Sequence, residues 1–216
     1  MEYKPPSPEP LIFPRGVRFP REDEIPGDKQ EVLDKVAQAH ITTGYVRRDA
    51  ENEPFQTYIE ANVHAPNVFS VFRDLVWALV PDVAAPLIGV KEDEPEFGPY
   101  TDREWAVGVF EPYVDLLQND GFLEFGVLHQ SDFGFEEIFV ASSKFFKIWT
   151  NNGPKAEEVL QAAGIPRSET LQFIDEYPMV SLSLDDEGNA AWAGPFYAIR
   201  QEFVRLPQPT VVEGEQ

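Results

Sequence analysis

The clearest two-residue period in the chain runs from position 55 to position 63. Its less polar positions are Phe55, Thr57, Ile59, Ala61 and Val63. Polar or amphipathic residues alternate with them, which is typical of a strand that buries one face. We therefore predict a half-exposed strand over 55–63.

Apolar residues recur at helical spacing in four other segments: 29–39, 66–79, a stretch that begins at Thr101, and 154–163. Apolar side chains three or four positions apart share one side of an amphipathic helix. Asp28 is a candidate N-cap for the first helix, because Glu31 follows in the capping-box position. Pro112 falls inside the segment that begins at Thr101, and we expect it to kink that helix or split it in two.

Short β-prone runs fill much of the remaining chain. We predict a buried strand over 83–90, in which Pro86 favours a sheet edge or a bulge. Three runs in close succession predict a meander of hairpins, at 122–129, 135–141 and 144–150. Further along the chain, segments 171–174 and 180–184 are β-like. We predict a turn at 185–189, a return strand at 190–192, and either a helix or a strand at 199–206.

Residues 1–28 differ from the rest because they contain seven prolines, which fix φ and remove backbone donors. We expect an extended or polyproline II arm. Leu11, Phe13 and Val17 are interleaved with the prolines, so the arm packs either on its own domain, the alternative we favour, or on a partner. The predicted organisation is an arm at 1–28, one globular domain at 29–206 and a tail at 207–216.

These elements together predict a single α+β domain. A mixed, largely antiparallel sheet of about five to seven strands is expected to pack against about three helices. The composition agrees, because 216 residues with 43% hydrophobic and 13% aromatic side chains suffice for a sizeable core.

The chain is strongly acidic, with 38 acidic against 17 basic residues and a formal net charge of −21. Phosphates and anionic lipids attract Lys and Arg, so we expect neither nucleic acid nor a membrane as partner. The chain has no cysteine, which excludes disulfides and thiolate ligands. No signal-peptide pattern follows Met1, and the most apolar stretch, 75–90, is short and interrupted by prolines. We expect a cytoplasmic protein.

The negative charge is unevenly distributed. Residues 91–137 hold thirteen acidic residues against Lys91 and Arg103, a net charge of −11, and no basic residue lies between 168 and 199. The intervening segment 138–167 has a net charge of +2. Concentrated charge favours a surface that docks a basic protein, whereas a uniform acidic coat serves solubility.

Candidate catalytic and metal-binding residues gather around His129. Together with Asp132, Glu136 and Glu137 it offers imidazole and carboxylate ligands for a divalent ion, although Asp132 also fits a hairpin turn. Ser142 or Ser143 with His129 would supply a nucleophile and a base. No nucleotide-binding, calcium-loop or hydrolase-elbow motif is present, and we expect no cofactor.

The leading functional hypothesis is a non-catalytic module that binds a basic protein. Its most concrete form is a bacterial immunity-type inhibitor that masks a basic surface of a toxin or effector. The residues expected to form the acidic binding patch are Glu92, Asp93, Glu94, Glu96, Asp132, Glu136 and Glu137. The alternatives are a carboxylate- or metal-dependent hydrolase with a site near His129, a nucleic-acid mimic, and an acidic soluble protein without a directed binding surface.

Overall fold

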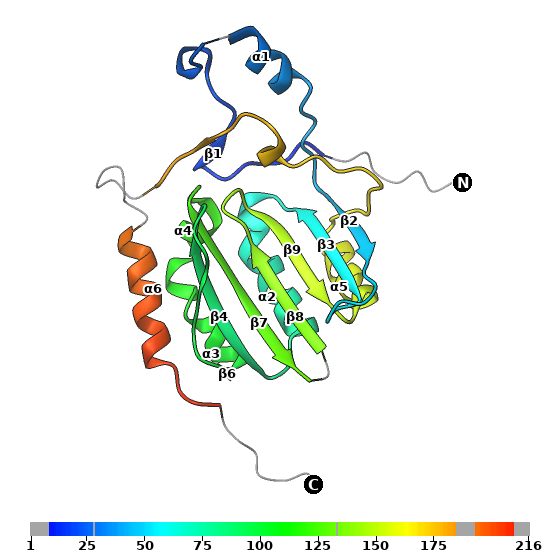
Figure 1. Ribbon diagram of the computed structural model, residues 1–216, viewed down its shortest axis with the longest axis vertical. Helices are drawn as coiled ribbons and strands as arrows, with labels where there is room; N and C mark the ends of the chain where they lie inside the picture. The colour runs from blue at the N-terminus through cyan, green and yellow to red at the C-terminus, as the bar shows by residue number, and fades with distance from the viewer. Residues whose placement is uncertain (1–8, 28, 133, 185–192, 210–216) are drawn as a thin grey trace.

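The computed structural model describes residues 9–27, 29–132, 134–184 and 193–209, and it shows one large sheet backed by helices (Figure 1). The sheet has eight strands in the order β2-β3-β9-β8-β7-β4-β5, with β6 also paired to β4. All of its strand pairs are antiparallel. The prediction of an α+β fold with a largely antiparallel sheet is therefore confirmed. The strands are β2 (Gly44–Asp49), β3 (Thr57–Asn62), β4 (Val83–Val90), β5 (Glu96–Phe97), β6 (Thr101–Asp102), β7 (Leu123–Ser131), β8 (Gly134–Val140) and β9 (Phe145–Thr150).

The central strands form the predicted meander. β7, β8 and β9 follow one another in the chain and lie side by side, with Val140 opposite both Phe125 and Phe146. The connection from β8 to β9 is tight, and Lys144 adopts a left-handed φ of 65° there. β3 pairs with β9, and Ile59 is fully buried on the side that the alternation at 55–63 predicted.

β4 lies where the long central strands give way to the edge of the sheet. It pairs with β7 along its length from residue 85 to residue 90, but its other side pairs only with the short strands β5 and β6. Pro86 falls between these two short pairings, and its carbonyl accepts a hydrogen bond from the N–H of Gly98 at 2.8 Å. Pro86 has no N–H to donate, but its carbonyl is still paired at this point.

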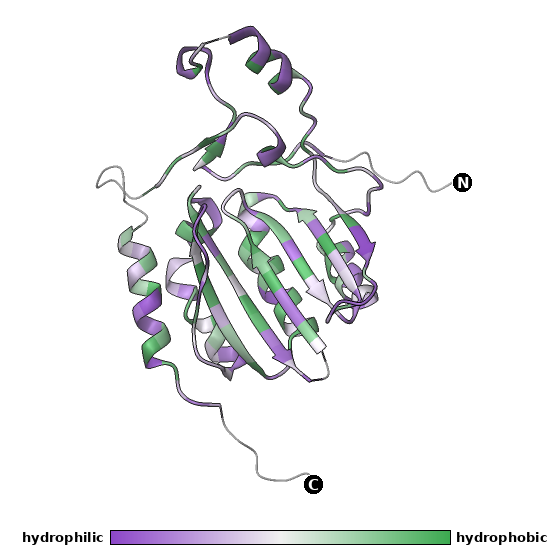
Figure 2. Ribbon diagram, in the orientation of Figure 1, coloured by the Kyte–Doolittle hydropathy of each residue, from purple (hydrophilic) through white to green (hydrophobic). Residues whose placement is uncertain are grey.

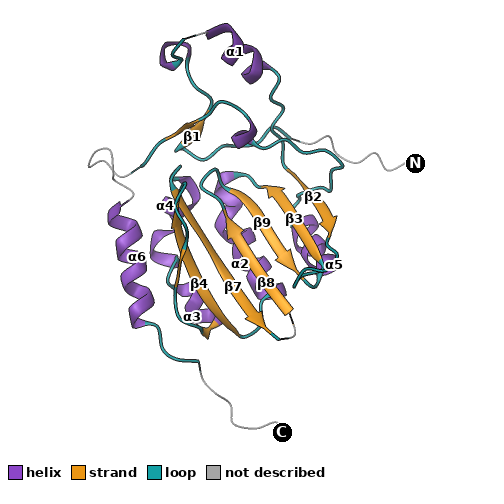
Figure 3. Cartoon of the chain, in the orientation of Figure 1, coloured by secondary structure: helices purple, strands orange, loops and turns teal. Residues whose placement is uncertain are grey.

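Most helices lie against one face of the sheet (Figure 3). α2 packs against α5, α4 and β8, and α3 packs against β4. α6 runs along β4 at the sheet edge (Figure 1). Pro112 does split its segment, since α3 and α4 are separated by a 3-10 turn at Glu111–Tyr113. The α-helices are α1 (Lys29–Ala37), α2 (Val68–Leu79), α3 (Arg103–Gly108), α4 (Val114–Asn119), α5 (Gly153–Ala162) and α6 (Ala193–Arg205).

Strand alternation gives the sheet two unlike faces. On the helix face, Ile59, Phe125 and Ile138 are fully buried in the main core together with Phe72 and Leu75 of α2. We call the opposite side the open face, because none of the described helices α2 to α5 lies on it (Figure 1). Its side chains include Tyr58, Trp149, Glu137 and Leu128, which are neither fully buried nor fully exposed. A smaller cluster of Leu87, Phe139, Ala141, Phe145 and Phe173 covers part of this face.

A two-stranded ribbon crosses one end of the sheet. It pairs β1 (Val17–Arg18) with β10 (Val180–Ser181) in antiparallel register. Gly16 passes so close to Gly121 that a Cβ on Gly16 would lie 2.5 Å from the backbone nitrogen of Gly121. Only glycine fits such a crossing of two backbones. Residues 9–18 thus run along the domain, and Val17 is 1% exposed.

Several local predictions need correction. The apolar side of α1 is not a core surface, because none of its residues is buried, and the helix stands away from the sheet and is largely hydrophilic (Figure 2). The segment 171–174 is not a strand, and the edge strand β2 was not predicted. The ambiguous segment 199–206 belongs to a helix, α6. The expected cap Asp28, the turn at 185–189, the strand at 190–192 and residues 210–216 lie outside the described residues.

Among the described residues, no helix has both the length and the apolar character needed to cross a bilayer. The longest, α6, has 13 residues, whereas a membrane-spanning helix needs about 20.

Candidate functional site

The seven acidic residues expected to form one patch are dispersed. Glu92, Asp93 and Glu94 are exposed in the turn after β4, at the end of the sheet where Val90 pairs with Leu123. Asp132 is exposed in the turn between β7 and β8, at the opposite end of the same strands. The length of β7 therefore separates these two groups.

The other three residues are placed differently again. Glu96 forms an ion pair with Arg200 of α6, with 2.5 Å between the two atoms. Glu136 points into the helix face and is 9% exposed, so it is corrected from a surface position to a buried one. Glu137, the next residue, points to the open face because successive strand residues alternate. The structure thus brings no more than three of the seven acids, those of the turn after β4, onto one exposed segment.

His129 has structural partners. Its Nδ1 lies 2.7 Å from the carbonyl of Val83, which can only accept, so Nδ1 donates there. Its ring also packs edge-on against Tyr100 at a centroid distance of 6.2 Å. Glu136 is directly opposite His129 in the β7–β8 ladder, and the backbone N–H of Asn151 donates to its carboxylate at 2.9 Å.

No three His, Asp or Glu side chains converge into a possible metal site within the described part of the chain. The grouping of His129 with Asp132, Glu136 and Glu137 fails because Glu137 lies on the other face of the sheet and Asp132 lies in the turn. Ser142 and Ser143 lie beyond the end of β8 that is farther from His129. Neither the metal grouping nor the serine–histidine pair is assembled.

A cluster of buried ionisable groups does exist beside Ser142. Lys144 is 2% exposed and donates from Nζ to the carbonyl of Leu123. Burial lowers the pKa of Lys144 to about 7, against the attraction of Asp120 and Glu124. Asp120 in turn accepts from the N–H of Leu123 at 3.1 Å, and Glu124 from the N–H of Ser142 at 3.1 Å. These bonds tie neighbouring turns together, which is a structural role.

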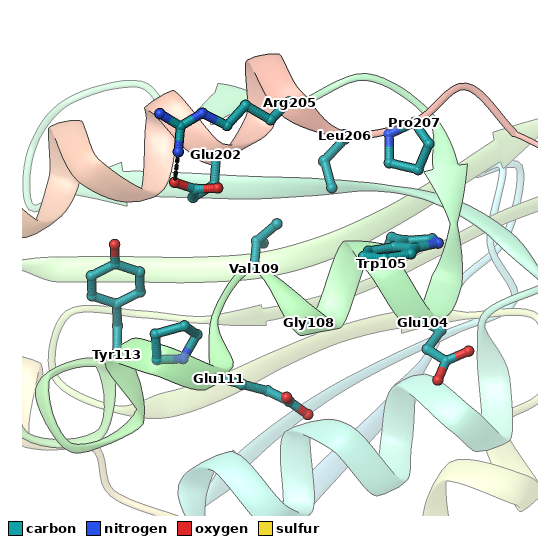
Figure 4. Close-up of a pocket in the computed structure, with 11 residues that line it drawn as sticks. Glu104, Trp105, Gly108, Val109, Glu111, Tyr113, Glu202, Arg205, Leu206 and Pro207 are labelled. Carbon is teal, nitrogen blue, oxygen red and sulfur yellow. Dashed lines mark hydrogen bonds and ion pairs between the residues drawn. The ribbon is translucent and has the colours of Figure 1, made fainter.

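A concave surface lies between α3 and α6 (Figure 4). We call it the α3–α6 groove, and its volume is about 800 Å³. One wall comes from α3 and the following 3-10 turn, and the other from the end of α6 and the residues after it. The lining residues are Glu104, Trp105, Gly108, Val109, Glu111, Pro112, Tyr113, Glu202, Arg205, Leu206 and Pro207.

Buried contacts hold the two walls in place. The hydroxyl of Thr101, just before α3, is fully buried and donates to the carbonyl of Pro207 at 2.8 Å. Phe110 and Phe203 meet edge to face at 6.4 Å. Gly108 has open space where a Cβ would be, so it leaves the groove unfilled. Both walls are therefore anchored to buried residues, including the wall that continues past α6 to Pro207.

The groove presents apolar side chains to solvent. Trp105 is 56% exposed and faces Leu206 and Pro207 (Figure 4). Around α6, more broadly, the exposed large hydrophobic residues are Phe97, Tyr100, Trp105, Tyr197 and Val204. Of these five residues Trp105 lines the groove, and an exposed aromatic residue in a concave surface is typical of binding sites, because it buries much area at little entropic cost.

The rim of the groove is acidic. Glu104 and Glu111 are exposed and have no basic partner among the described residues. Glu202 and Arg205 pair with each other across 2.5 Å (Figure 4). Arg205, the one basic residue among the described lining residues, is thus already neutralised by an acid, and the remaining rim charge is negative. A cationic ligand would find complementary charge at both carboxylates.

The sequence interpretation missed this site, although it contained a signal. Apolar residues recur at helical spacing in the segment that begins at Thr101. The structure buries Ala106, Val107 and Phe110 of this segment, whereas Trp105 and Val109 line the groove. Apolar residues therefore occupy two sides of this segment. One side is buried in the core, and the other lines the groove.

Comparison of the chain with protein-family models, with curated protein sequences and with solved structures found no match.

Proposed function

We propose that this protein is a non-catalytic module that binds a basic partner protein in the α3–α6 groove. The observation that supports this most directly is the exposed Trp105 in an apolar groove whose unpaired rim residues, Glu104 and Glu111, are acidic. The groove also lies within the segment of greatest negative charge, 91–137. The original acidic patch is thereby replaced by a smaller site with an apolar centre.

The partner segment would carry apolar anchors flanked by Lys or Arg. Burial of Trp105 and Val109 would supply affinity, and the rim carboxylates would speed association and fix orientation. The last ten residues of the sequence contain Glu213 and Glu215 and no Lys or Arg, so they lack the charge that the rim attracts. An immunity-type inhibitor, which covers a basic surface of a toxin or effector, is the specific role that we propose.

A synthetic helical peptide of leucine and lysine tests the site by fluorescence anisotropy, with its leucine–glutamate counterpart as the negative probe. Trp105→Ala should weaken binding of the basic peptide about tenfold, as expected for a central aromatic anchor. The double variant Glu104→Lys and Glu111→Lys should slow association and flatten its dependence on salt.

The matched control is Glu51→Lys with Glu53→Lys, which makes the same charge change in the exposed turn between β2 and β3. If this control slows association as much as the rim variant does, overall charge and not the groove governs binding, and the proposal is wrong.

The immunity role has its own test. Co-expression with a growth-inhibiting protein encoded next to this gene should restore growth, and Trp105→Ala should abolish that rescue. If growth is still restored by Trp105→Ala and by the rim variant, the inhibitory surface lies elsewhere on the protein.

A further inference from the structure

The open face of the sheet carries an unusual arrangement around Glu137. This residue lies directly opposite Trp149 on β9 and Leu128 on β7. Phe135 and Phe139 are two residues away on β8 and point to the same face. A carboxylate is therefore surrounded by four apolar side chains, two of them across the ladders and two along its own strand.

No group in the described structure compensates this charge. Glu137 makes no hydrogen bond or ion pair with another described residue. Several charged side chains lie elsewhere on this face. Glu60 and Lys147 pair two strand positions away from Glu137, and Arg48 of β2 is opposite Tyr58. Asp175 interacts electrostatically with Lys147 and Glu60. Arg48 pairs with Glu60 at 3.3 Å. Burial is the only cause acting on the carboxyl of Glu137, and it raises the pKa to about 7.

Aromatic rings extend the site sideways. Trp149 packs against Tyr58 with ring centroids 5.2 Å apart and planes inclined by 35°, and Phe135 lies 6.2 Å from Phe55. Tyr58, Trp149 and Phe135 are all partly exposed. Rings with accessible faces next to an unpaired carboxylate are suited to bind an organic cation, because the ring face and the carboxylate both attract positive charge.

We propose that the open face binds an arginine side chain of a partner protein, with the guanidinium paired to Glu137 and stacked on Trp149. Arginine fits better than lysine because its planar group can stack on an indole ring and still donate two hydrogen bonds to one carboxylate. The same chain already holds one guanidinium over an indole, that of Arg103 over Trp77 at 5.2 Å. This surface lies on the opposite side of the sheet from α3, so it is distinct from the α3–α6 groove and does not depend on it.

The probe is the capped tripeptide acetyl-Gly-Arg-Gly-amide, titrated at pH 8 and physiological ionic strength while the Trp149 indole N–H and the Glu137 carboxyl are observed by NMR. Both signals should shift, and the pKa of Glu137 should fall when the peptide is bound. The same tripeptide with lysine should bind more weakly, and that with citrulline, which is planar but uncharged, should bind about tenfold more weakly than arginine.

Glu137→Gln should lower the affinity for the arginine tripeptide about tenfold, and Trp149→Leu should lower it as well. Asp132→Asn, which removes the same charge in the neighbouring turn, is the matched control and should leave it unchanged. Trp105→Ala should also have no effect, so failure of the groove proposal and failure of this one are distinguishable.

Equal affinity of the Glu137→Gln variant and the unaltered protein would overturn the proposal, provided that circular dichroism shows both to be folded. Equal affinity for the citrulline and arginine tripeptides would overturn it too, because binding would then not depend on the cation. Equal affinity for lysine and arginine would reject arginine as the ligand.

Discussion

Glu136 and Glu137 are neighbours in the chain and face opposite sides of the same sheet. Glu136 points toward the helices, is 9% exposed and accepts a hydrogen bond from the N–H of Asn151. Glu137 points to the open face, among Trp149 and Leu128, and has no partner among the described residues. Burial raises the pKa of both carboxyl groups.

This comparison shows how two glutamates in the same strand acquire different roles. On the helix face the buried carboxylate of Glu136 accepts the N–H of Asn151 at Oε1 and so connects β8 to the end of β9, while its Oε2 has no hydrogen-bond partner among the described residues. On the open face the carboxylate of Glu137 is left uncompensated, which costs stability in the free protein and would be offset by a bound cation. The helix face is thus organised for stability, and the open face for binding.

The largest expected difference is in the free energy of unfolding when one phenylalanine on each face is replaced by alanine. Phe125→Ala on the helix face should destabilise the protein by about 3–5 kcal/mol, because Phe125 is fully buried and its ring lies 4.9 Å from that of Phe72. Phe135→Ala on the open face should cost about 1 kcal/mol, because its side chain is only partly buried. Urea unfolding measures both, and equal losses would mean that the open face is also part of the stabilising core.

Glu137→Gln should have an intermediate effect on the free energy of unfolding, and this effect should depend on pH. The folded-state pKa of about 7 lies above the unfolded value near 4.5, so the folded state binds this proton more tightly. The contribution of Glu137 to stability is complete below pH 4.5 and is lost as the pH rises through 7. Glu137→Gln should therefore be more stable than the unaltered protein by about 1 kcal/mol at pH 8 and nearly equal to it at pH 4.5.

Thermal unfolding of both proteins across this pH range provides the measurement, with Asp132→Asn as the control that should show no such pH-dependent gain. A difference that stays constant with pH would argue against the partly buried, unpaired state of Glu137.

The smallest effect concerns Gly108 in the α3–α6 groove. Gly108→Ala should stabilise α3 by about 0.5 kcal/mol, because alanine restricts the unfolded chain and favours the helix, and the added Cβ meets no atom within 4 Å. The new methyl group should nevertheless weaken binding of the leucine–lysine peptide if that peptide occupies the groove. Differential scanning calorimetry and anisotropy separate the two effects, and a loss of stability would show that the space above Gly108 is not free.

Much of the fold could be predicted because its signals are local. The alternation at 55–63, the apolar stripe of 66–79 and the three runs after 122 each correspond to observed elements. β2 was missed because Arg47, Arg48 and Asp49 lack the hydrophobic alternation of a strand. They nevertheless form one, because β3 supplies a ladder and Arg47 pairs with Glu157 of α5 at 2.7 Å.

The candidate site was less predictable than the fold. The segment 91–137, in which acid is concentrated, also forms one wall of the α3–α6 groove. The residues selected there from the sequence were different ones, namely Glu92, Asp93, Glu94, Glu96 and the hairpin acids. The other wall, Leu206 and Pro207, lies about a hundred positions away in the chain. Its approach to Trp105 depends on the hydrogen bond of Thr101 to Pro207 and on the packing of Phe203.

The sequence alone determined most of the long helices and strands, since the period of the apolar side chains and Pro112 act within a few residues, but it did not determine β2 or the helical state of 199–205. It also determined the negative charge and the lack of thiol chemistry. Only the tertiary structure decided which acids share a surface, because pairing β7 with β4 and β8 separates Glu92 from Asp132 by the length of a strand and turns Glu136 and Glu137 to opposite faces. Helical and strand periods are fixed by local backbone geometry, whereas the neighbours of a side chain are fixed by register and layer packing between distant segments.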